Sequence, residues 1–157
     1  MKTTAPQVSR MPGHLIRRLH QQATLVFQKR IGALGHDLTS VQYAALDALA
    51  DNPGVDQATL AMLIAKDRAT VGAVLDRLEA KDLIARSVRD TDKRARRLNL
   101  SEQGLALLNA LRPTVEAAQR EILPGLTAAE YDQFVTLAAK AASVTANLAD
   151  RGAPGRR

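Results

Sequence analysis

The feature that most constrains this fold is a short basic turn between two strand-like segments, followed at once by a helix start. The segments are residues 83–88 and 95–100, with the turn at 89–94. Residues 86–97 hold six basic and two acidic side chains, a balance of +4 within the chain's net charge of +6. Ser101 can cap the helix that follows. The pattern predicts a positively charged β-hairpin, which can track along a phosphate backbone or enter the minor groove of duplex DNA.

Helices are predicted on both sides of this hairpin, from apolar residues spaced three and four apart. They cover residues 12–34, ending at Gly35, then 40–50, 57–64, 68–81, a long segment from Ser101 to Pro124, and a last helix through Ala149. Predicted N-caps are Thr39 with Gln42, Asp56, Asp67, and Thr127 with Glu130. Pro113 lies inside the fifth helix and is predicted to kink or loosen it.

The predicted fold is mainly α with a small β-wing, a winged helix-turn-helix flanked by helices at both ends. Residues 37–103 form the predicted DNA-binding lobe, residues 11–36 and 104–149 a helical dimerisation region, and residues 1–10 and 150–157 disordered tails. The terminal helices are apolar and alanine-rich, so they need a partner surface. They can pack on each other within a monomer or interdigitate with a second subunit. We favour the second, because a two-fold dimer matches DNA half-sites about 10 bp apart.

Composition excludes several functions. The chain has no cysteine, which rules out disulfides, thiolate catalysis and Cys-based zinc sites. Aromatic residues make up only 3%, which argues against recognition of RNA or single strands by base stacking. There is no Gly-rich phosphate loop, metal-ligand cluster or partnered nucleophile, so we expect neither an enzyme nor a metal or cofactor. Without a membrane-length apolar run or a secretory signal, we expect a cytoplasmic protein.

Residues 68–81 are the predicted recognition helix, with Val71, Val74, Leu75 and Leu78 as its inward stripe. On its outer side, Arg68 can pair with guanine and Thr70 with a base or phosphate, while Ala69 or Ala73 can touch a thymine methyl group. Gly72 is expected to let the helix approach DNA closely. The predicted DNA-binding residues are Lys66, Arg68, Ala69, Thr70, Gly72, Ala73 and Arg77, and on the wing Arg86, Arg89, Lys93, Arg94 and Arg96. Arg94 is the predicted minor-groove residue, and Asp92 is expected to brace the wing.

Residues 67–104 resemble the recognition helix and wing of the multiple antibiotic resistance regulator (MarR) family. The family's wing motif, Asp-x-Arg-x-x-x-Leu-x-Leu-Thr-x-x-Gly, is matched by Asp92, Arg94, Leu98, Leu100 and Gly104, with Ser101 in place of Thr. The order of helices matches over residues 12–149. The resemblance implies an obligate homodimer with a triangular α/β winged-helix body, and usually repression that a small phenolic or aromatic-acid ligand relieves. Pro113 is less usual in that helix.

A ligand site is predicted near the first helix. His14 and Arg18 are four residues apart and share a helix face, and Arg can bind a carboxylate in a bidentate manner. The opening segment, residues 12–21, also resembles MarR-family regulators of aromatic and N-heterocyclic acid catabolism. The predicted ligand-binding residues are His14, Arg18, Tyr43, Leu46 and Met62. The alternative is that His14 and Arg18 are surface or inter-subunit salt-bridge residues.

These patterns and the resemblance together predict a ligand-responsive regulator that binds a pseudo-palindromic DNA operator as a homodimer. We expect it to repress an aromatic-acid catabolic operon and to be released by a small aromatic carboxylate. The alternative is a DNA-binding or architectural protein without an effector. Ligand binding to the folded state alone would raise the melting temperature, which separates the two hypotheses.

Overall fold

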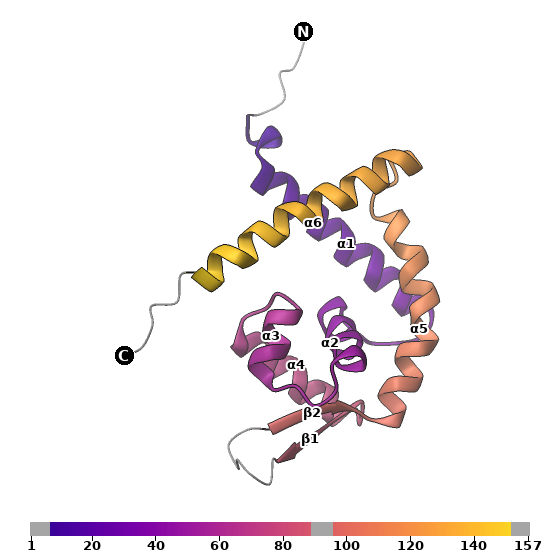
Figure 1. Cartoon of the computed structure of the whole chain (residues 1–157). Coiled ribbons are helices and arrows are strands. Elements are labelled where there is room, and N and C mark those ends of the chain that lie inside the picture. The colour runs from indigo at the N-terminus through magenta and orange to yellow at the C-terminus, as the bar shows by residue number, and fades with distance from the viewer. Residues whose placement is uncertain (1–6, 89–95, 152–157) are drawn as a thin grey trace. The chain divides into compact units, whose positions relative to one another are not determined.

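A computed structural model describes the backbone of residues 7–88 and 96–151, and the side chains of residues 8–88 and 96–143. The chain forms two compact units, residues 1–119 and 120–157. The described elements are η1 (Gln7–Arg10), α1 (Pro12–Ala33), α2 (Ser40–Asp51), α3 (Gln57–Leu63), α4 (Arg68–Ala80), β1 (Ile84–Val88), β2 (Arg96–Leu100), α5 (Glu102–Glu121) and α6 (Ala128–Arg151) (Figure 1). The predicted fold class, mainly α with a small β-wing, is confirmed.

Local hydrogen bonds start the helices where the sequence predicts. At α2, the Gln42 N–H donates to Thr39 Oγ1 at 3.2 Å, and the Thr39 N–H donates to Gln42 Oε1 at 2.9 Å. Thr127 and Glu130 make the same reciprocal pair at the start of α6. The Asp56 and Asp67 carboxylates each accept from a backbone N–H three residues later, at 2.8 Å. Each bond satisfies a donor that the first turn would otherwise leave unpaired.

The first unit has one continuous apolar core. The predicted stripe of α4 is buried, with Val71, Leu75 and Leu78 each 0% exposed. The core also takes side chains from the end of α1, from α2, α3 and α5, and from both strands. Figure 1 shows α2, α3 and α4 gathered over the two strands. This core holds the helices and the hairpin in fixed positions, so the side chains on the surface of the lobe have a rigid support.

The two strands pair antiparallel, from Ile84 opposite Leu100 to Val88 opposite Arg96. Leu98 ties the hairpin to the rest of the lobe: its N–H donates to Val55 O, and its carbonyl accepts from the Gly54 N–H, both at 2.9 Å. Leu98 is also 1% exposed. The base of the wing is therefore held in the core, while the turn at residues 89–95 lies outside the described residues.

The start of α5 explains why the wing motif ends in glycine. Gly104 packs so closely on Leu83, the residue directly before β1, that a Cβ there would lie 1.9 Å from Leu83 O. The same carbonyl accepts from the Ser101 N–H at 3.1 Å, and Ser101 Oγ accepts from the Gly104 N–H at 2.9 Å. Only a residue without a side chain fits at position 104.

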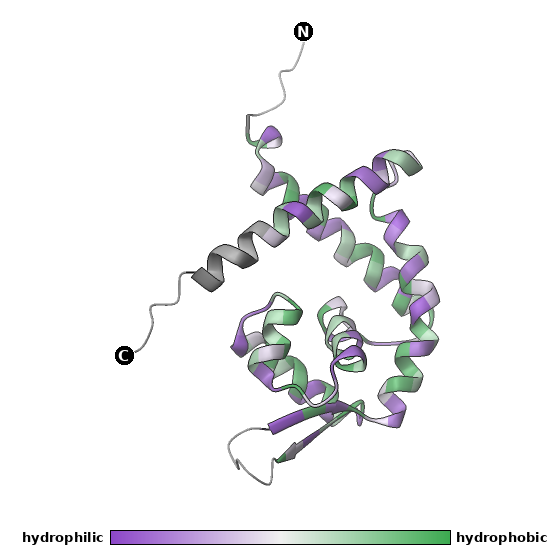
Figure 2. Cartoon of the chain, viewed as in Figure 1, coloured by the Kyte–Doolittle hydropathy of each residue, from purple (hydrophilic) through white to green (hydrophobic). Residues whose placement is uncertain are grey.

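The second unit contains the whole of α6 and the end of α5. Near its start, the Arg120 guanidinium lies over the Tyr131 ring, 5.1 Å from the ring centroid, in cation–π geometry. Apolar and polar residues both occur along the described part of α6 (Figure 2), and Val135 and Leu137 are 48% and 56% exposed. This helix therefore leaves apolar side chains uncovered by its own chain.

Two details differ from the sequence-based expectations. Residues Gln7–Arg10 form a short 3-10 helix where a disordered tail was predicted, and α6 extends to Arg151. The helix α5 continues through Pro113, and Leu108, Leu111 and Val115 are buried on both sides of it, while a kink there stays a prediction. No helix within the described ranges is both long and apolar enough to cross a membrane.

Candidate nucleic-acid interface

Helices α3 and α4 form the predicted helix-turn-helix. The turn closes through Ala65, whose φ is 52°, and through the Lys66 N–H, which donates to Ala61 O at 2.9 Å. The Gln57 side chain of α3 donates to Arg68 O at 3.0 Å, which fixes the first turn of α4. Lys66 and Arg68 border a hollow at this turn. The start of α4, where recognition helices contact base edges, is thus firmly positioned.

The outer side of α4 is exposed. Ala69, Ala73 and Arg77 are four residues apart, so they form one row along the helix, and all three are exposed. Thr70 lies beside this row and Arg68 lies in the first turn, and both are also exposed. The small side chains of this row leave room for a duplex, and Arg77 adds a positive charge at its far end.

The Thr70 hydroxyl already has a partner. It donates to Asp67 Oδ2 at 2.6 Å, because an ionised carboxylate can only accept. This bond is the main cause that lowers the pKa of Asp67 from its ordinary value of 3.8. The Thr70 oxygen can then accept but has no second proton to give. It suits an amino group of adenine or cytosine in the major groove better than a phosphate.

The structure gives a reason for glycine at position 72 that lies within the protein, whereas the sequence analysis explained this glycine by close approach to DNA. It is half-buried, and a Cβ there would lie 3.2 Å from Gln57 Nε2. That separation is tighter than ordinary van der Waals contact, so glycine lets Gln57 reach Arg68 O. Gly72 therefore has a role in packing α3 against α4, and its predicted role in close approach to DNA stays a prediction.

Arg86 was predicted to contact DNA, and the structure gives it other partners. Its Nη2 lies 2.7 Å from Asp76 Oδ1 and its Nη1 lies 3.3 Å from Glu79 Oε2, both on α4. Its side chain is 15% exposed. Two carboxylates therefore hold this guanidinium against α4, and its predicted contact with DNA stays a prediction.

The remaining wing residues fall into two groups. Arg96 is exposed at the outer end of β2, as is Arg97. The predicted contacts Arg89, Lys93 and Arg94, and the predicted bracing residue Asp92, lie outside the described residues. Their roles remain predictions from the sequence.

The predicted ligand residues do not form one pocket within the lobe. Leu46 is 0% exposed in the core, so it cannot line a cavity unless the core opens. Met62 is 78% exposed and borders the hollow at the α3–α4 turn. Tyr43 packs on Phe27 of α1, with ring centroids 5.8 Å apart. Phe27 is nine residues beyond Arg18, roughly 14 Å along a helix axis.

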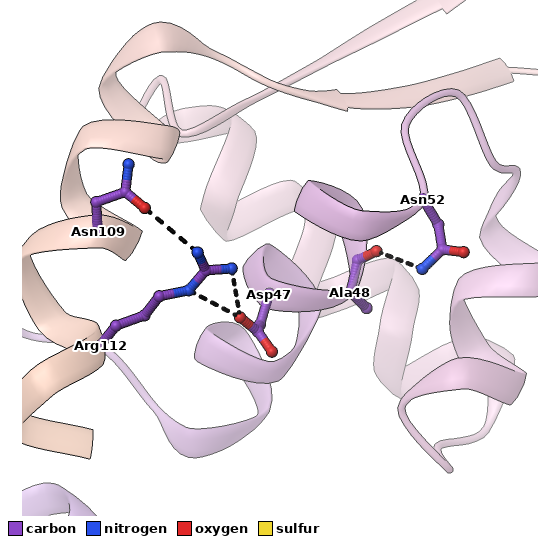
Figure 3. Close-up of polar contacts among 5 residues, drawn as sticks. All are labelled: Asp47, Ala48, Asn52, Asn109 and Arg112. Atoms are coloured by element: carbon purple, nitrogen blue, oxygen red, sulfur yellow. Dashed lines mark hydrogen bonds and ion pairs between the residues drawn. The ribbon is translucent and has the colours of Figure 1, made fainter. Parts of the chain in front are cut away.

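Sequence analysis missed a polar cluster between α2 and α5. Arg112 reaches from α5 to Asp47 of α2, where Nη2 and Nε donate to Oδ1 at 3.1 and 3.4 Å (Figure 3). Its Nη1 donates to Asn109 Oδ1 at 3.4 Å. Burial, and then the charge of Asp47, raise the pKa of the nearby Tyr43. Asp47 and Arg112 are 65 residues apart in sequence, so no local pattern could reveal the pair.

Comparisons with known proteins agree with this geometry. Residues 36–95 match the sequence model of the MarR family. Over 130 residues the chain is 34% identical to the HTH-type transcriptional repressor NicR of Pseudomonas putida, covering 83% of this chain and 81% of NicR.

Two solved structures share the fold. The chain is 32% identical to Bordetella bronchiseptica BpsR, whose DNA binding is regulated by 6-hydroxynicotinic acid, with a TM-score of 0.80 over 88% of this chain and 98% of BpsR. It is 31% identical to Streptomyces coelicolor PcaV in complex with its natural ligand, with a TM-score of 0.79 over 90% and 99% of the two chains. With its helix-turn-helix, its wing and these relatives, the chain belongs to the MarR family.

Proposed function

We propose that this protein is a homodimeric, ligand-responsive transcriptional repressor that binds duplex DNA. The observation that carries the proposal is the exposed row of α4, Ala69, Ala73 and Arg77, on a lobe that also bears a basic hairpin. A helix with small and basic residues outward fits a major groove, and the hairpin supplies cations for the backbone or minor groove. NicR is a transcriptional repressor by name, which supports the same role here.

The homodimer is supported by apolar side chains that the chain leaves uncovered. On α1, Leu15, Ile16 and Leu25 are 43%, 65% and 63% exposed, and on α6, Val135 and Leu137 are about half exposed. A second copy would remove these side chains from water. We assign residues 11–36 and 104–149 to this dimerisation region and residues 37–103 to the DNA-binding lobe.

The proposed effector is a small aromatic carboxylate. BpsR is regulated by 6-hydroxynicotinic acid, a compound of this class. Arg18, with His14 on the same face of α1, offers a bidentate partner for its carboxylate. Arg112, near Tyr43, is a second candidate, which would have to exchange its bonds to Asp47 for the ligand. A tenfold loss of operator affinity needs about 1.4 kcal/mol of preference for the DNA-incompetent state.

DNA binding is tested by footprinting and by titration at several salt concentrations. We expect protection of a pseudo-palindromic site of roughly 16–20 bp and an affinity that falls steeply with salt. Arg68→Ala should cost about 1–3 kcal/mol and relax preference at one base pair. Arg94→Ala should weaken binding most at A·T-rich flanks, where the minor groove is narrow. Lys29→Ala, which removes a charge from α1, is the control; salt-independent binding would contradict the proposal.

The effector is tested by calorimetry with a panel of benzoate-type and hydroxypyridine-carboxylate acids. Wild-type protein should bind at least one acid, and that acid should lower operator affinity. Loss of binding in Arg18→Ala but not in Arg112→Ala locates the carboxylate at α1, and the reverse result locates it at α5. If no acid binds or changes the melting temperature, the protein is a repressor without this kind of ligand, and the effector-independent alternative is favoured.

A further inference from the structure

We infer that Arg86 is a positioning residue, which holds the base of the wing against the recognition helix α4 through Asp76 and Glu79. The inference rests on the proposed DNA-binding function. It separates the basic residues of the wing that would contact DNA from one that positions the wing. Arg86 belongs to the basic wing by sequence, but its two ion pairs point into the lobe. Its effect on DNA would therefore be indirect, through the placement of the outer wing.

Strand alternation sets the direction of this side chain. Successive residues of a strand face opposite sides, so Ile84, Arg86 and Val88 share one face of β1. Ile84 is buried, Arg86 is half-buried and Val88 is 57% exposed, so the exposure of this face increases along β1 toward the turn of the wing. Arg86 is the last residue on that face that the lobe still covers. It lies where the hairpin leaves the body.

The partners on α4 suit a rigid attachment. Asp76 and Glu79 are three residues apart, so their carboxylates emerge on the same side of the helix. Each takes a different terminal nitrogen of Arg86, at 2.7 and 3.3 Å. A planar guanidinium held at two nitrogens has little freedom to rotate, unlike the point charge of a lysine.

The opposite strand is anchored at the same level. Arg86 is paired in register with Leu98, and Leu98 is bound to Gly54 and Val55 through its backbone. One rung of the hairpin is thus attached to α4 through Arg86 and to the α2–α3 turn through Leu98. The attachment at Leu98 consists of backbone bonds and a buried side chain, so the attachment at Arg86 is the one that mutation can remove without emptying the core.

This arrangement explains why α4, which is proposed to approach the negatively charged DNA, carries the two acidic residues Asp76 and Glu79. In a purely electrostatic view, removing Asp76 and Glu79 reduces repulsion and tightens DNA binding. If the two acids hold Arg86, their removal frees the wing and weakens binding. The two views predict changes of opposite sign.

The central experiment measures operator affinity of Asp76→Asn/Glu79→Gln by fluorescence anisotropy. We expect binding roughly three- to tenfold weaker than wild type, the range typical of residues that act through another element. The matched control is Asp82→Asn, which removes an acid from the turn between α4 and β1. Asp82 has a φ of 55°, a conformation that asparagine adopts readily. The control should bind as wild type or slightly tighter.

Arg86→Lys separates positioning from direct phosphate contact. Lysine keeps the charge and would serve a phosphate well, so a direct contact predicts near-wild-type affinity. A positioning role predicts weaker binding with an unchanged slope of affinity against salt, since no phosphate contact is lost. If Arg86→Gln instead lowers that slope by about one per subunit, Arg86 contacts phosphate and the inference is wrong.

Amide hydrogen exchange without DNA gives an independent readout. In Asp76→Asn/Glu79→Gln, exchange should rise at Arg86–Val88 and Arg96–Arg97 but not in α2. Unchanged exchange together with unchanged or tighter DNA binding overturns the inference. If the wild-type protein binds no DNA, the proposed function fails, while the exchange result still decides whether Arg86 holds the hairpin.

Discussion

The DNA-binding lobe and the flanking helices use apolar residues in opposite ways. In the lobe, Leu46, Leu75 and Leu98 are at most 1% exposed, whereas Ile16 of α1 and Leu137 of α6 are 65% and 56% exposed. Fully burying one such side chain contributes about 1.5–3 kcal/mol, which the lobe gains within one chain. The exposed residues of α1 and α6 gain it only from another surface, although the end of α1 and much of α5 bury side chains in the core of the first unit. The lobe can therefore fold on internal contacts, while the exposed faces of α1 and α6 need a partner surface.

Deleting residues 127–157 should have the largest effect, because it removes the whole of α6. We expect aggregated or unfolded protein, since the apolar surface that α6 covers in the proposed dimer becomes exposed. Light scattering and circular dichroism measure this. Deleting residues 152–157, which lie beyond α6, should change neither reading. A well-folded monomer from the larger deletion would break the comparison, because α6 would then be dispensable for assembly.

Gly104→Ala should destabilise the lobe by about 3 kcal/mol or more, because the new Cβ meets Leu83 O at 1.9 Å and backbone must move. Urea unfolding followed by circular dichroism measures the loss. Gly32→Ala is the matched control, since a Cβ at position 32 meets nothing within 4 Å in helix α1. That variant should gain roughly 1 kcal/mol from helix propensity. Equal stability of the two variants would mean that α5 does not start as the structure shows.

Leu137→Gln should weaken assembly by about 1–2 kcal/mol if this exposed side chain meets a second copy. The signature is a dimer dissociation constant higher than that of wild type, measured by analytical ultracentrifugation over a range of protein concentrations. Leu63→Gln, on the exposed side of α3, changes a leucine of similar exposure, 48%, in the lobe. Its dissociation constant should match that of wild type; the same increase in both variants would contradict a dimer surface on α6.

Thr70→Val should alter DNA preference by about 1 kcal/mol at one base pair and leave assembly unchanged. The wild-type oxygen can only accept, so we expect it to favour a base with an amino group, adenine or cytosine. Selection from a randomised operator measures the change. Thr70→Ser keeps the hydroxyl and should keep the preference. A uniform loss on all sequences would instead indicate a phosphate contact.

The smallest effect is a pH dependence at the start of α4. Hydrogen bonds from Thr70 lower the pKa of Asp67 below 3.8, so the ionised carboxylate stabilises the fold above the unfolded-state pKa. That contribution is lost as pH falls through the lower, folded-state value. Asp67→Asn, which can still cap the helix, should reduce the difference in unfolding free energy between about pH 6 and about pH 3. An identical pH profile in both proteins would show that Asp67 does not contribute.

Local rules predicted most of the fold. The caps at Thr39, Asp56, Asp67 and Thr127 join residues three apart in sequence, and each forms as predicted. The buried stripe of α4 follows from helical spacing alone. Such features depend on a few consecutive residues, so a single sequence suffices to place them.

The candidate sites could be predicted only in part. Apart from the half-buried Gly72, the outer positions of α4 are exposed as helical spacing predicts, because a buried stripe determines its opposite face. The ligand residues did not come together in the lobe, because helical spacing indicates which face Leu46 occupies but not what covers that face. No sequence pattern predicted the ion pair between Arg112 and Asp47, since each residue alone is typical of an ordinary surface charge.

By itself, the sequence determined the order of the helices, their caps, the hairpin and its positive charge. Only the tertiary structure decided that Arg86 binds acids on α4, that Gly72 makes room for Gln57, and that Gly104 must lack a side chain. Each of these depends on a distance between elements that no local spacing specifies. Periodicity determines the direction in which a side chain projects from its own helix or strand. Packing of the core determines which group of another element it contacts.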